Sequence, residues 1–324
     1  MYEPPYKVSD KAMECMVEIA AALERYKIVL EGSDGVRLRR LNHIRTIRGT
    51  TAIEGNTLTE EQITAVLSGR RVIASKREIE EVTNAHKVYT EIESFNPYSA
   101  DDLLRAHSMM TDGLVDRPGE WRNCNVGVMG EGGVSHIAPP FCSVPGLMSD
   151  LFTWLNESEA PMLIKSSVFH YEFEFIHPFP DGNGRMGRLW QTALLGSWRE
   201  EFYGVPVENI VWAHQNEYYD AIRRSGAIGE CGPFIDFMLD KILRTLKARG
   251  EAYEIVGKSR DKSRDKSRDK ILELLKSQPQ LTESELADAI GLSVKAVEKA
   301  IAQLKDANRL RRKGGKKFGE WEVV

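Results

Sequence analysis

The stretch that organises this sequence is His177-Pro178-Phe179-Pro180-Asp181-Gly182-Asn183-Gly184-Arg185-Met186-Gly187-Arg188. Its two prolines and its Asp-Gly pair interrupt any continuous helix through the first half. After Asn183 the chain becomes apolar and helix-forming, with Met186, Leu189, Trp190, Ala193 and Leu194. The stretch therefore predicts a loop that runs directly into a helix.

The residue types of this stretch together indicate phosphate chemistry. Its glycines let the backbone approach a ligand closely, and free amides at a helix N-terminus attract anions. Its two arginines, one helical turn apart, add positive charge. Asp181 can hold Mg²⁺, the usual companion of a triphosphate. His177 lies at the start of the loop with a reference pKa of about 6.5, which suits a group that takes a proton near neutral pH.

The segment resembles the signature of the Fic (Fic/Doc) family, His-Pro-Phe-x-Asp-Gly-Asn-Gly-Arg-x-x-Arg, and matches every specified position. The resemblance implies a protein adenylyltransferase, a nucleotidyltransferase that moves AMP from ATP to a Tyr, Thr or Ser hydroxyl of a target protein. It implies His177 as the catalytic base and Asp181 as the Mg²⁺ ligand. The implied nucleotide-binding residues are Gly182, Asn183 (through its side chain as well), Gly184, Arg185, Met186, Gly187 and Arg188.

Further points concern the group that is transferred and the adenine base of the nucleotide. Relatives that act as kinases carry a different residue, often Lys, in place of Gly184, so the Gly-Asn-Gly form favours AMP transfer, with UMP still open. Tyr218 and Tyr219 are candidates for stacking on adenine, although aromatic residues more commonly fill a core. A DNA-binding regulator whose Fic core only senses nucleotide is the non-enzymatic alternative, and the intact His177 and Asp181 argue against it.

A second motif precedes the first by more than a hundred residues. The helical pattern of residues 36–48 continues through Thr50 and Glu54, which share a face, and stops at Gly55. A glutamate at a helix C-terminus is unfavourable, because that end of the helix dipole is negative, and an arginine partner would resolve the conflict. The sequence therefore predicts an ion-pair partner for Glu54.

Thr50-x-x-x-Glu54-Gly55 resembles the inhibitory motif Ser/Thr-x-x-x-Glu-Gly/Asn of many Fic proteins. The resemblance implies that Glu54 pairs with Arg188 and keeps ATP in an unproductive pose. The same glutamate could instead orient a water that removes AMP from a modified target, so a de-AMPylating or bifunctional enzyme is an alternative. The sequence does not decide between the two directions.

The fold class indicated is mainly α: a helical Fic core with a small β-hairpin flap, followed by a winged helix-turn-helix-like domain. Helices are expected at residues 9–31, 36–54, from 57 onward, 75–92, 101–110, 144–157, 161–176, 184–200, 208–224 and 233–256. Residues 126–137 alternate around a Gly-rich turn and predict the hairpin. An exposed hairpin edge can pair with an extended peptide, and in the family such a flap holds the target.

Three histidines have competing interpretations. His170, Glu174 and His177 have a spacing that suggests zinc, but His-Glu-x-x-His is absent and Pro178 ends the helix, so we reject a zinc site. We expect His170 to support the loop structurally and His107 to be a core or edge histidine. Phe179 is expected to pack inward and fix the loop.

Bulk composition excludes several classes. The chain has 324 residues, of which 42% are hydrophobic and 28% charged, with a net charge of −4. These values are typical of a soluble globular protein and give no global attraction to nucleic acid or membrane. The four cysteines are far apart in the sequence and form no Cys-x-x-Cys motif. This spacing favours reduced thiols. With no signal peptide or spanning segment evident, we expect a cytoplasmic protein without a membrane partner.

The C-terminal part has a different composition. Ser-Arg-Asp-Lys occurs three times between Ser259 and Lys270, and this segment reads as a linker or a charged helix, with linker-like behaviour and partial helicity favoured. Residues 271–324 resemble a winged helix-turn-helix with a basic hairpin over residues 309–321. They carry ten basic and eight acidic residues, which is weak for a DNA binder. Nucleic acid and protein are therefore both candidate partners.

The expected domain organisation has four parts: an N-terminal helical region over residues 1–100, a catalytic core over 101–256, a charged linker over 257–270 and a winged-helix-like domain over 271–324. The target protein, the modified residue, the trigger that relieves inhibition and the formation of a homodimer stay open at this point.

Overall fold

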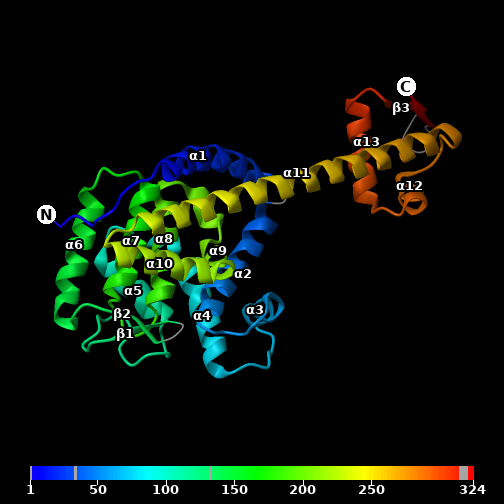
Figure 1. Cartoon of the computed structure of the whole chain (residues 1–324). Helices are drawn as coiled ribbons and strands as arrows, with labels where there is room; N and C mark the ends of the chain where they lie inside the picture. The colour runs from blue at the N-terminus through cyan, green and yellow to red at the C-terminus, as the bar shows by residue number, and fades with distance from the viewer. Residues whose placement is uncertain (1, 33–34, 131–132, 314–319) are drawn as a thin grey trace. The chain divides into compact units, whose positions relative to one another are not determined.

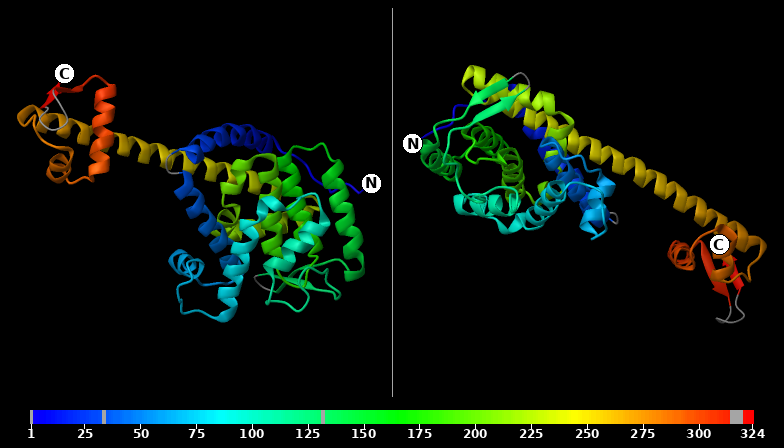
Figure 2. Two further views of the ribbon diagram at one scale, coloured as in Figure 1. Left: turned by 180° about the vertical axis from the view of Figure 1, so that it is seen from behind. Right: turned by 90° about the horizontal axis from the view of Figure 1, so that it is seen from below.

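The structure, a computed structural model, describes residues 2–32, 35–130, 133–313 and 320–324, and their side chains outside 128–137 and 249–266. The chain forms two compact units, Met1–Gly250 and Glu251–Val324. Figure 1 labels the elements of both units, and Figure 2 gives two further views. No helix of the described residues is long and apolar enough to cross a membrane, and the cysteines at 15, 124, 142 and 231 are free thiols.

The first unit consists of helices and one pair of strands in the part that the structure describes. Its helices are α1 (Asp10–Glu31), α2 (Gly35–Ile53), α3 (Glu60–Leu67), α4 (Lys76–Thr90), α5 (Ala100–Met110), α6 (Val144–Glu157), α7 (Met162–Ile176), α8 (Asn183–Trp198), α9 (Val207–Ala213), α10 (Gln215–Ile228) and the start of α11 (Gly232–Ser277). Three 3₁₀ turns, η1 (Ile92–Ser94), η2 (Phe141–Ser143) and η3 (Glu200–Gly204), connect them. The predicted mainly α class is confirmed.

Helices α7 and α8 pack against each other and form the centre of the first unit. Both are buried on nearly every side. Helix α7 is largely apolar, which favours this burial, whereas α8 also buries Arg185, Arg188 and Gln191. Phe169 and Phe173 of α7 and Leu189 and Trp190 of α8 are fully buried. The loop that joins the two helices, residues 177–182, is therefore held at both ends by the core.

The helix that carries Thr50 packs closely on α9. A Cβ added to Gly49 would lie 2.5 Å from the backbone nitrogen of Asn209, so only glycine allows this approach. Ser75 and Thr59 close capping boxes at the starts of α4 and α3. The end of α2 is thus fixed against its neighbours before any ligand is considered.

The hairpin predicted over residues 126–137 is present. Strands β1 (Gly127–Gly130) and β2 (Gly133–Ile137) are antiparallel, with Gly127 opposite Ile137 and a register shift between Val128 and Met129. Its two tip residues, 131 and 132, lie outside the described residues.

Two expected segments differ from the structure. The single helix predicted over 208–224 is wrong, because the chain leaves helical geometry at His214 (φ −127°, ψ 35°) and α9 and α10 are separate. The expected linker with partial helicity over 257–270 is continuous helix within α11. Residues 258–277 contain neither glycine nor proline and are rich in Lys and Arg, so nothing interrupts that helix.

The second unit has its own core. It contains α12 (Glu283–Ile290), α13 (Val294–Asp306) and the antiparallel strands β3 (Leu310–Lys313) and β4 (Glu320–Val323), together with the end of α11. Gly291 turns the chain between the two helices at φ 70°. The buried residues of this core are Ile271, Leu272, Leu275, Leu286, Ala287, Val297, Ile301, Leu304, Leu310 and Trp321. The predicted winged helix-turn-helix arrangement is confirmed, and residues 314–319 of its hairpin lie outside the described ranges.

Candidate active site

The site begins where α7 ends, at His177. This residue has a left-handed backbone (φ 51°, ψ 60°), which a residue with a side chain rarely adopts. Its N–H donates to the carbonyl of Phe173 at 2.9 Å. The turn directs the chain away from the helix axis, so the half-buried imidazole stands at the start of the loop.

A buried arginine outside the signature holds this turn. The Arg122 side chain is 2% exposed, and its Nε donates to the carbonyl of His177 at 2.9 Å. Its other nitrogens donate to the carbonyls of Cys124, Pro139 and Ile176, and its backbone N–H donates to Pro178. Because Cys124 and Pro139 flank the hairpin, Arg122 links the base of the hairpin to the backbone of His177. No pattern in the sequence points to a role for Arg122.

Asn183 closes the loop on itself. Its Oδ1 accepts from the N–H of Phe179 at 2.8 Å, and its Nδ2 donates to the carbonyl of Phe179 at 2.8 Å. The side chain expected to bind phosphate is therefore engaged with the loop. The first backbone hydrogen bond of α8 runs from the N–H of Met186 to the carbonyl of Gly182. The amides of residues 183–185 precede that bond and are the groups that a helix N-terminus offers to a ligand.

His107 supports the same loop from α5. Its ring stacks on Phe179 with centroids 3.6 Å apart and planes 2° apart. Its Nδ1 accepts from the N–H of Gly119 at 2.9 Å, so Nε2 carries the proton and donates to the carbonyl of Asp181 at 3.1 Å. Burial lowers the pKa of His107 to about 4, so the ring is neutral at pH 7. The expected core histidine thus holds the carbonyl of the expected metal ligand.

The carboxylate of Asp181 is held by two arginines. Its Oδ1 accepts from the Gly182 N–H and from Arg185 Nη2 at 3.1 Å, and its Oδ2 accepts from Arg77 Nη2 at 3.2 Å. Burial by itself would raise the pKa of Asp181, but the charge of Arg185, the Gly182 amide and Arg77 together lower it. The group is therefore ionised and is a suitable ligand for a hard cation.

Arg185 and Arg188 are buried guanidinium groups, 2% and 1% exposed. In the part of the chain that the structure describes, Arg185 Nε, Arg185 Nη1 and Arg188 Nε have no hydrogen-bond acceptor. Buried donors without acceptors are rare and costly, and guanidinium groups match phosphate oxygens well. These unsatisfied donors at the start of α8 fit an anionic ligand such as a polyphosphate.

Glu54 reaches this cluster from the end of α2. Its Oε1 accepts from Arg188 Nη2 at 2.8 Å, and the same nitrogen donates to the carbonyl of Thr50 at 3.2 Å. Burial by itself would lower the pKa of Arg188, and the neighbouring Glu54 charge raises it instead. The structure brings together the two residues that the two motifs supply, 134 positions apart.

Gly184 leaves the space for this pair. A Cβ at that position would lie 2.7 Å from Glu54 Oε1 and 2.9 Å from Arg188 Nη1. Any side chain at 184 must therefore displace the carboxylate, the guanidinium or both. Gly55, which follows Glu54, has φ 93° and has nothing within 4 Å of an added Cβ, so its role is conformational.

Of the remaining expected nucleotide contacts, Met186, Gly187 and Tyr218 lie in the interior. Met186 is fully buried, and a Cβ on Gly187 would meet Glu174 and His170. Tyr218 is 2% exposed, and its hydroxyl bonds to His170 Nε2 at 3.0 Å. Tyr219 is 51% exposed and is the one of the two tyrosines that a ligand can reach.

His170 bonds through Nδ1 to Gln191 at 2.6 Å, so it ties α7 to α8 and to α10. No group of three or more His, Cys, Asp or Glu side chains forms a metal cluster among the described residues. Within the signature, Asp181 is the one acidic residue.

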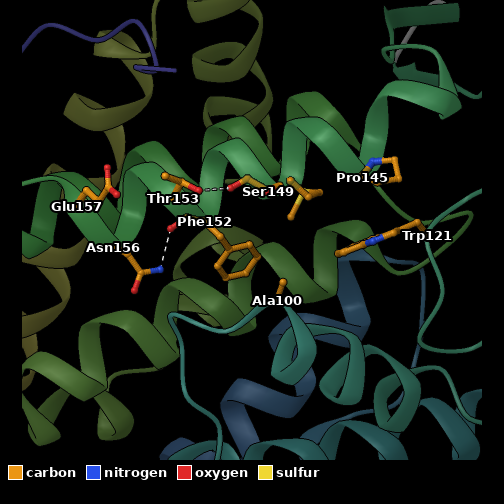
Figure 3. A pocket seen from close by; sticks show the side chains of 9 residues that line it. Ala100, Trp121, Pro145, Ser149, Phe152, Thr153, Asn156 and Glu157 are labelled. Carbon is orange, nitrogen blue, oxygen red and sulfur yellow. Dashed lines mark hydrogen bonds between the residues drawn. The ribbon is translucent and has the colours of Figure 1, made fainter. Parts of the chain in front are cut away.

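A pocket lies beside the loop, between α6 and the start of α5 (Figure 3). Its lining residues are Ala100, Trp121, Pro145, Met148, Ser149, Phe152, Thr153, Asn156 and Glu157. Trp121 also stacks on Phe179, with ring centroids 5.0 Å apart. The pocket and the loop therefore share one wall.

Fold and site together define a mainly helical core, with two buried arginines where a loop runs into α8, followed along the chain by a winged helix-turn-helix unit. Residues 97–195 match the model of the Fic/DOC family, and residues 264–311 match that of the winged helix-turn-helix DNA-binding family. A solved Fic family protein from Desulfovibrio desulfuricans G20 is similar at 35% identity and a TM-score of 0.75, over 100% of this chain and 98% of that one. This chain belongs to the Fic family.

Curated relatives carry an activity in their names. "Protein adenylyltransferase Fic" of Aedes aegypti is 31% identical over 222 residues, 65% of this chain and 42% of that protein. "Protein adenylyltransferase fic-1" of Caenorhabditis briggsae is 30% identical over 218 residues, 62% of this chain and 40% of that protein. The chain thus spans less than half the length of these two relatives. Fic-1 of C. elegans, at 22% identity and a TM-score of 0.61, shares the fold.

The neutral state of His107 makes stability depend on pH. The unfolded chain binds a proton on this histidine as the pH falls below about 6.5, while the folded chain does so only near pH 4. The folded state therefore loses up to about 3 kcal/mol from this residue between pH 6.5 and 4. In His107→Gln, urea unfolding at a series of pH values should show that much less loss than the wild type. His43, whose pKa is also lowered to about 4, is present in both proteins, so its contribution to the pH dependence cancels in the comparison. Parallel pH profiles for the two proteins would therefore contradict the assignment to His107.

Proposed function

We propose that this protein transfers AMP from ATP to a hydroxyl group of a target protein. The carrying observation is the set of unsatisfied guanidinium donors of Arg185 and Arg188 at the start of α8, next to Asp181 and His177. The curated relatives named protein adenylyltransferase support the choice of AMP and ATP. The Gly-Asn-Gly form of the loop is consistent with this choice.

In the proposed reaction the target hydroxyl oxygen attacks the α-phosphorus of ATP. A bond forms between that oxygen and phosphorus, the bond to the β-phosphate oxygen breaks, and pyrophosphate leaves. His177 takes the hydroxyl proton, and its strained turn, held by Arg122, fixes the position of the imidazole. The α8 amides and the two buried arginines stabilise the negative charge that develops on the phosphates.

Asp181 is the residue that would hold Mg²⁺. Its lowered pKa and its place beside the arginines fit a carboxylate that acts with phosphate oxygens as co-ligands. When bound, Mg²⁺ supplies neutralisation of phosphate charge. His107, through the carbonyl of Asp181, orients this residue from outside the signature.

Replacement of His177 tests the base. His177→Ala should reduce AMP transfer about 100-fold or more, because general-base catalysis contributes that much. ATP binding should survive, since the arginines and amides are unchanged. The assay follows labelled AMP from ATP on proteins of a cell lysate, and calorimetry follows nucleotide binding. Labelling at the wild-type rate would show that His177 is not the base.

The hairpin over residues 126–137 is the proposed docking place for the target. An extended target segment would pair with its edge and place the hydroxyl beside His177. Support comes from Arg122, which links both flanks of the hairpin, Cys124 and Pro139, to the carbonyl of His177.

Glu54 is the proposed inhibitor of this reaction. It occupies Arg188 Nη2, a donor that the outer phosphates of ATP need in the productive pose. A charge-assisted bond of this kind is worth about 1.5–3 kcal/mol. Its removal should free Arg188 for the nucleotide.

Glu54→Gly should raise auto-labelling by roughly ten- to a hundredfold, which is the rate equivalent of that bond. Glu54→Gln, which keeps the shape and loses the charge, should give an intermediate increase. Glu60→Gln is a matched control. Glu60 pairs with Arg45 and Arg48 on α2, so this substitution removes the same charge from a different ion pair. Equal labelling in Glu54→Gly and the wild type would refute the inhibitory role.

The reverse direction is a second candidate. Glu54 is 32% exposed at the site, so it has room to orient a water molecule towards the phosphorus of a modified target. In that case Glu54→Gly loses AMP removal from a pre-labelled protein while it gains transfer. The two measurements together separate a one-way enzyme from a bifunctional one.

For the unit Glu251–Val324 we propose nucleic-acid binding. The family description of residues 264–311 supports it, as do Lys295 and Lys299, both exposed on α13. Arg311 and Lys313 are exposed on β3. The small net positive charge of residues 271–324 predicts weak binding that depends on salt.

The full chain should shift mixed-sequence duplex DNA in a gel at low salt. Lys295→Ala with Lys299→Ala should weaken binding and lower the slope of log K against log salt by about 2, because each phosphate contact contributes about one unit. Lys270→Ala with Lys276→Ala, exposed on α11, is the charge-matched control. Absence of any shift, or equal loss in both pairs, would favour a protein partner for this unit.

A further inference from the structure

Arg77 contacts the oxygen of Asp181 that Arg185 leaves free. Arg185 Nη2 lies 3.1 Å from Oδ1, and Arg77 Nη2 lies 3.2 Å from Oδ2. Arg77 comes from the first turn of α4 and lies outside both motifs that point to the site. Its side chain is 57% exposed, and that of Asp181 is 40% exposed, so the pair lies at the solvent side of the loop.

Arg77 is held in place by residues that lead back to the inhibitory segment, which we define as Thr50–Asn56 and which carries the proposed inhibitor Glu54. Its Nε donates to Glu81 Oε1 at 3.1 Å, and Glu81 is 7% exposed. Glu81 Oε2 accepts from Asn56 Nδ2 at 2.9 Å. Asn56 follows Gly55 directly, and its own N–H returns to the carbonyl of Thr51. A continuous set of hydrogen bonds thus runs from the end of α2 through Asn56, Glu81 and Arg77 to Asp181.

This contact and a bound cation would compete for the same carboxylate. A guanidinium group and a divalent cation both need the carboxylate oxygen, and two positive charges a few ångströms apart repel. The bond from Arg77 Nε to Glu81 reduces the entropy that an exposed arginine would otherwise lose in pairing with Asp181. A cation that binds Asp181 Oδ2 therefore meets a guanidinium that is already oriented towards this oxygen.

We propose that Arg77 is a second autoinhibitory contact, which competes with Mg²⁺ for Asp181. The inference rests on the proposed function of Asp181 as the cation ligand. The inhibitory segment then acts at two places: Glu54 withholds Arg188 from the nucleotide, and Asn56, through Glu81 and Arg77, withholds Asp181 from the cation.

The test measures cation binding without catalysis. Mn²⁺ is titrated into the full chain with saturating α,β-methylene-ATP, whose α–β linkage cannot break, and binding is followed by water-proton relaxation. Arg77→Ala should bind Mn²⁺ roughly three- to tenfold more tightly than the wild type, the range expected for loss of one partly exposed ion pair and one like charge. The gain should shrink at high salt and should vanish when Asp181→Asn is also present.

Lys76→Ala is the matched control. Lys76 is adjacent in sequence, 90% exposed and paired with Glu80, so its removal changes net charge equally without touching Asp181. A Mn²⁺ affinity that is equal in Arg77→Ala and Lys76→Ala, including undetectable binding in both, overturns the proposal. Weaker Mn²⁺ binding in Arg77→Ala also overturns it and makes Arg77 a nucleotide ligand instead. Because no AMP is transferred, these outcomes do not depend on whether the proposed transfer reaction is correct.

Discussion

Two buried guanidinium groups at the start of α8 are the constraint on which the rest of the site depends. Taking such charges out of water is expensive, and a pair with one carboxylate repays this only in part. Arg185 has Asp181, and Arg188 has Glu54 and the carbonyl of Thr50, yet three of their nitrogens have no acceptor among the described residues. The fold therefore keeps an excess of buried positive charge at the start of α8, where an anion would be stabilised.

The loop of residues 177–182, which leads into α8, is held in place by residues outside it. Arg122 holds the carbonyls on either side of the turn at His177, His107 holds the carbonyl of Asp181, and Asn183 closes the loop on Phe179. These bonds are made largely to backbone groups. The bonds from Arg122 and His107 are made to backbone carbonyls, so they fix the loop without engaging the polar side chains of residues 177–182.

The sequence predicts the helical class, the hairpin, the winged unit and the residues of the loop, because glycines, prolines and charges at fixed spacing have few interpretations. The pairing of Glu54 with Arg188 is also predicted, through the resemblance of Thr50-x-x-x-Glu54-Gly55 to the inhibitory motif of Fic proteins. The sequence does not reveal Arg122, His107 or Arg77, since a bond to a distant carbonyl or carboxylate leaves no local pattern. The same limit explains Asn183, whose amide the loop backbone occupies, and the break at His214, which separates α9 from α10.

The close approach at Gly184 also limits how this protein can change. An added Cβ there would lie 2.7 Å from Glu54 Oε1 and 2.9 Å from Arg188 Nη1, so a substitution at 184 must shift the end of one or both of these side chains. A change at Glu54 releases Arg188 and leaves it intact. The Glu54–Arg188 pair therefore responds to changes on two elements far apart in the sequence: at the end of α2, where Glu54 itself is lost, and at the start of α8, where a new side chain would compete with both partners for space.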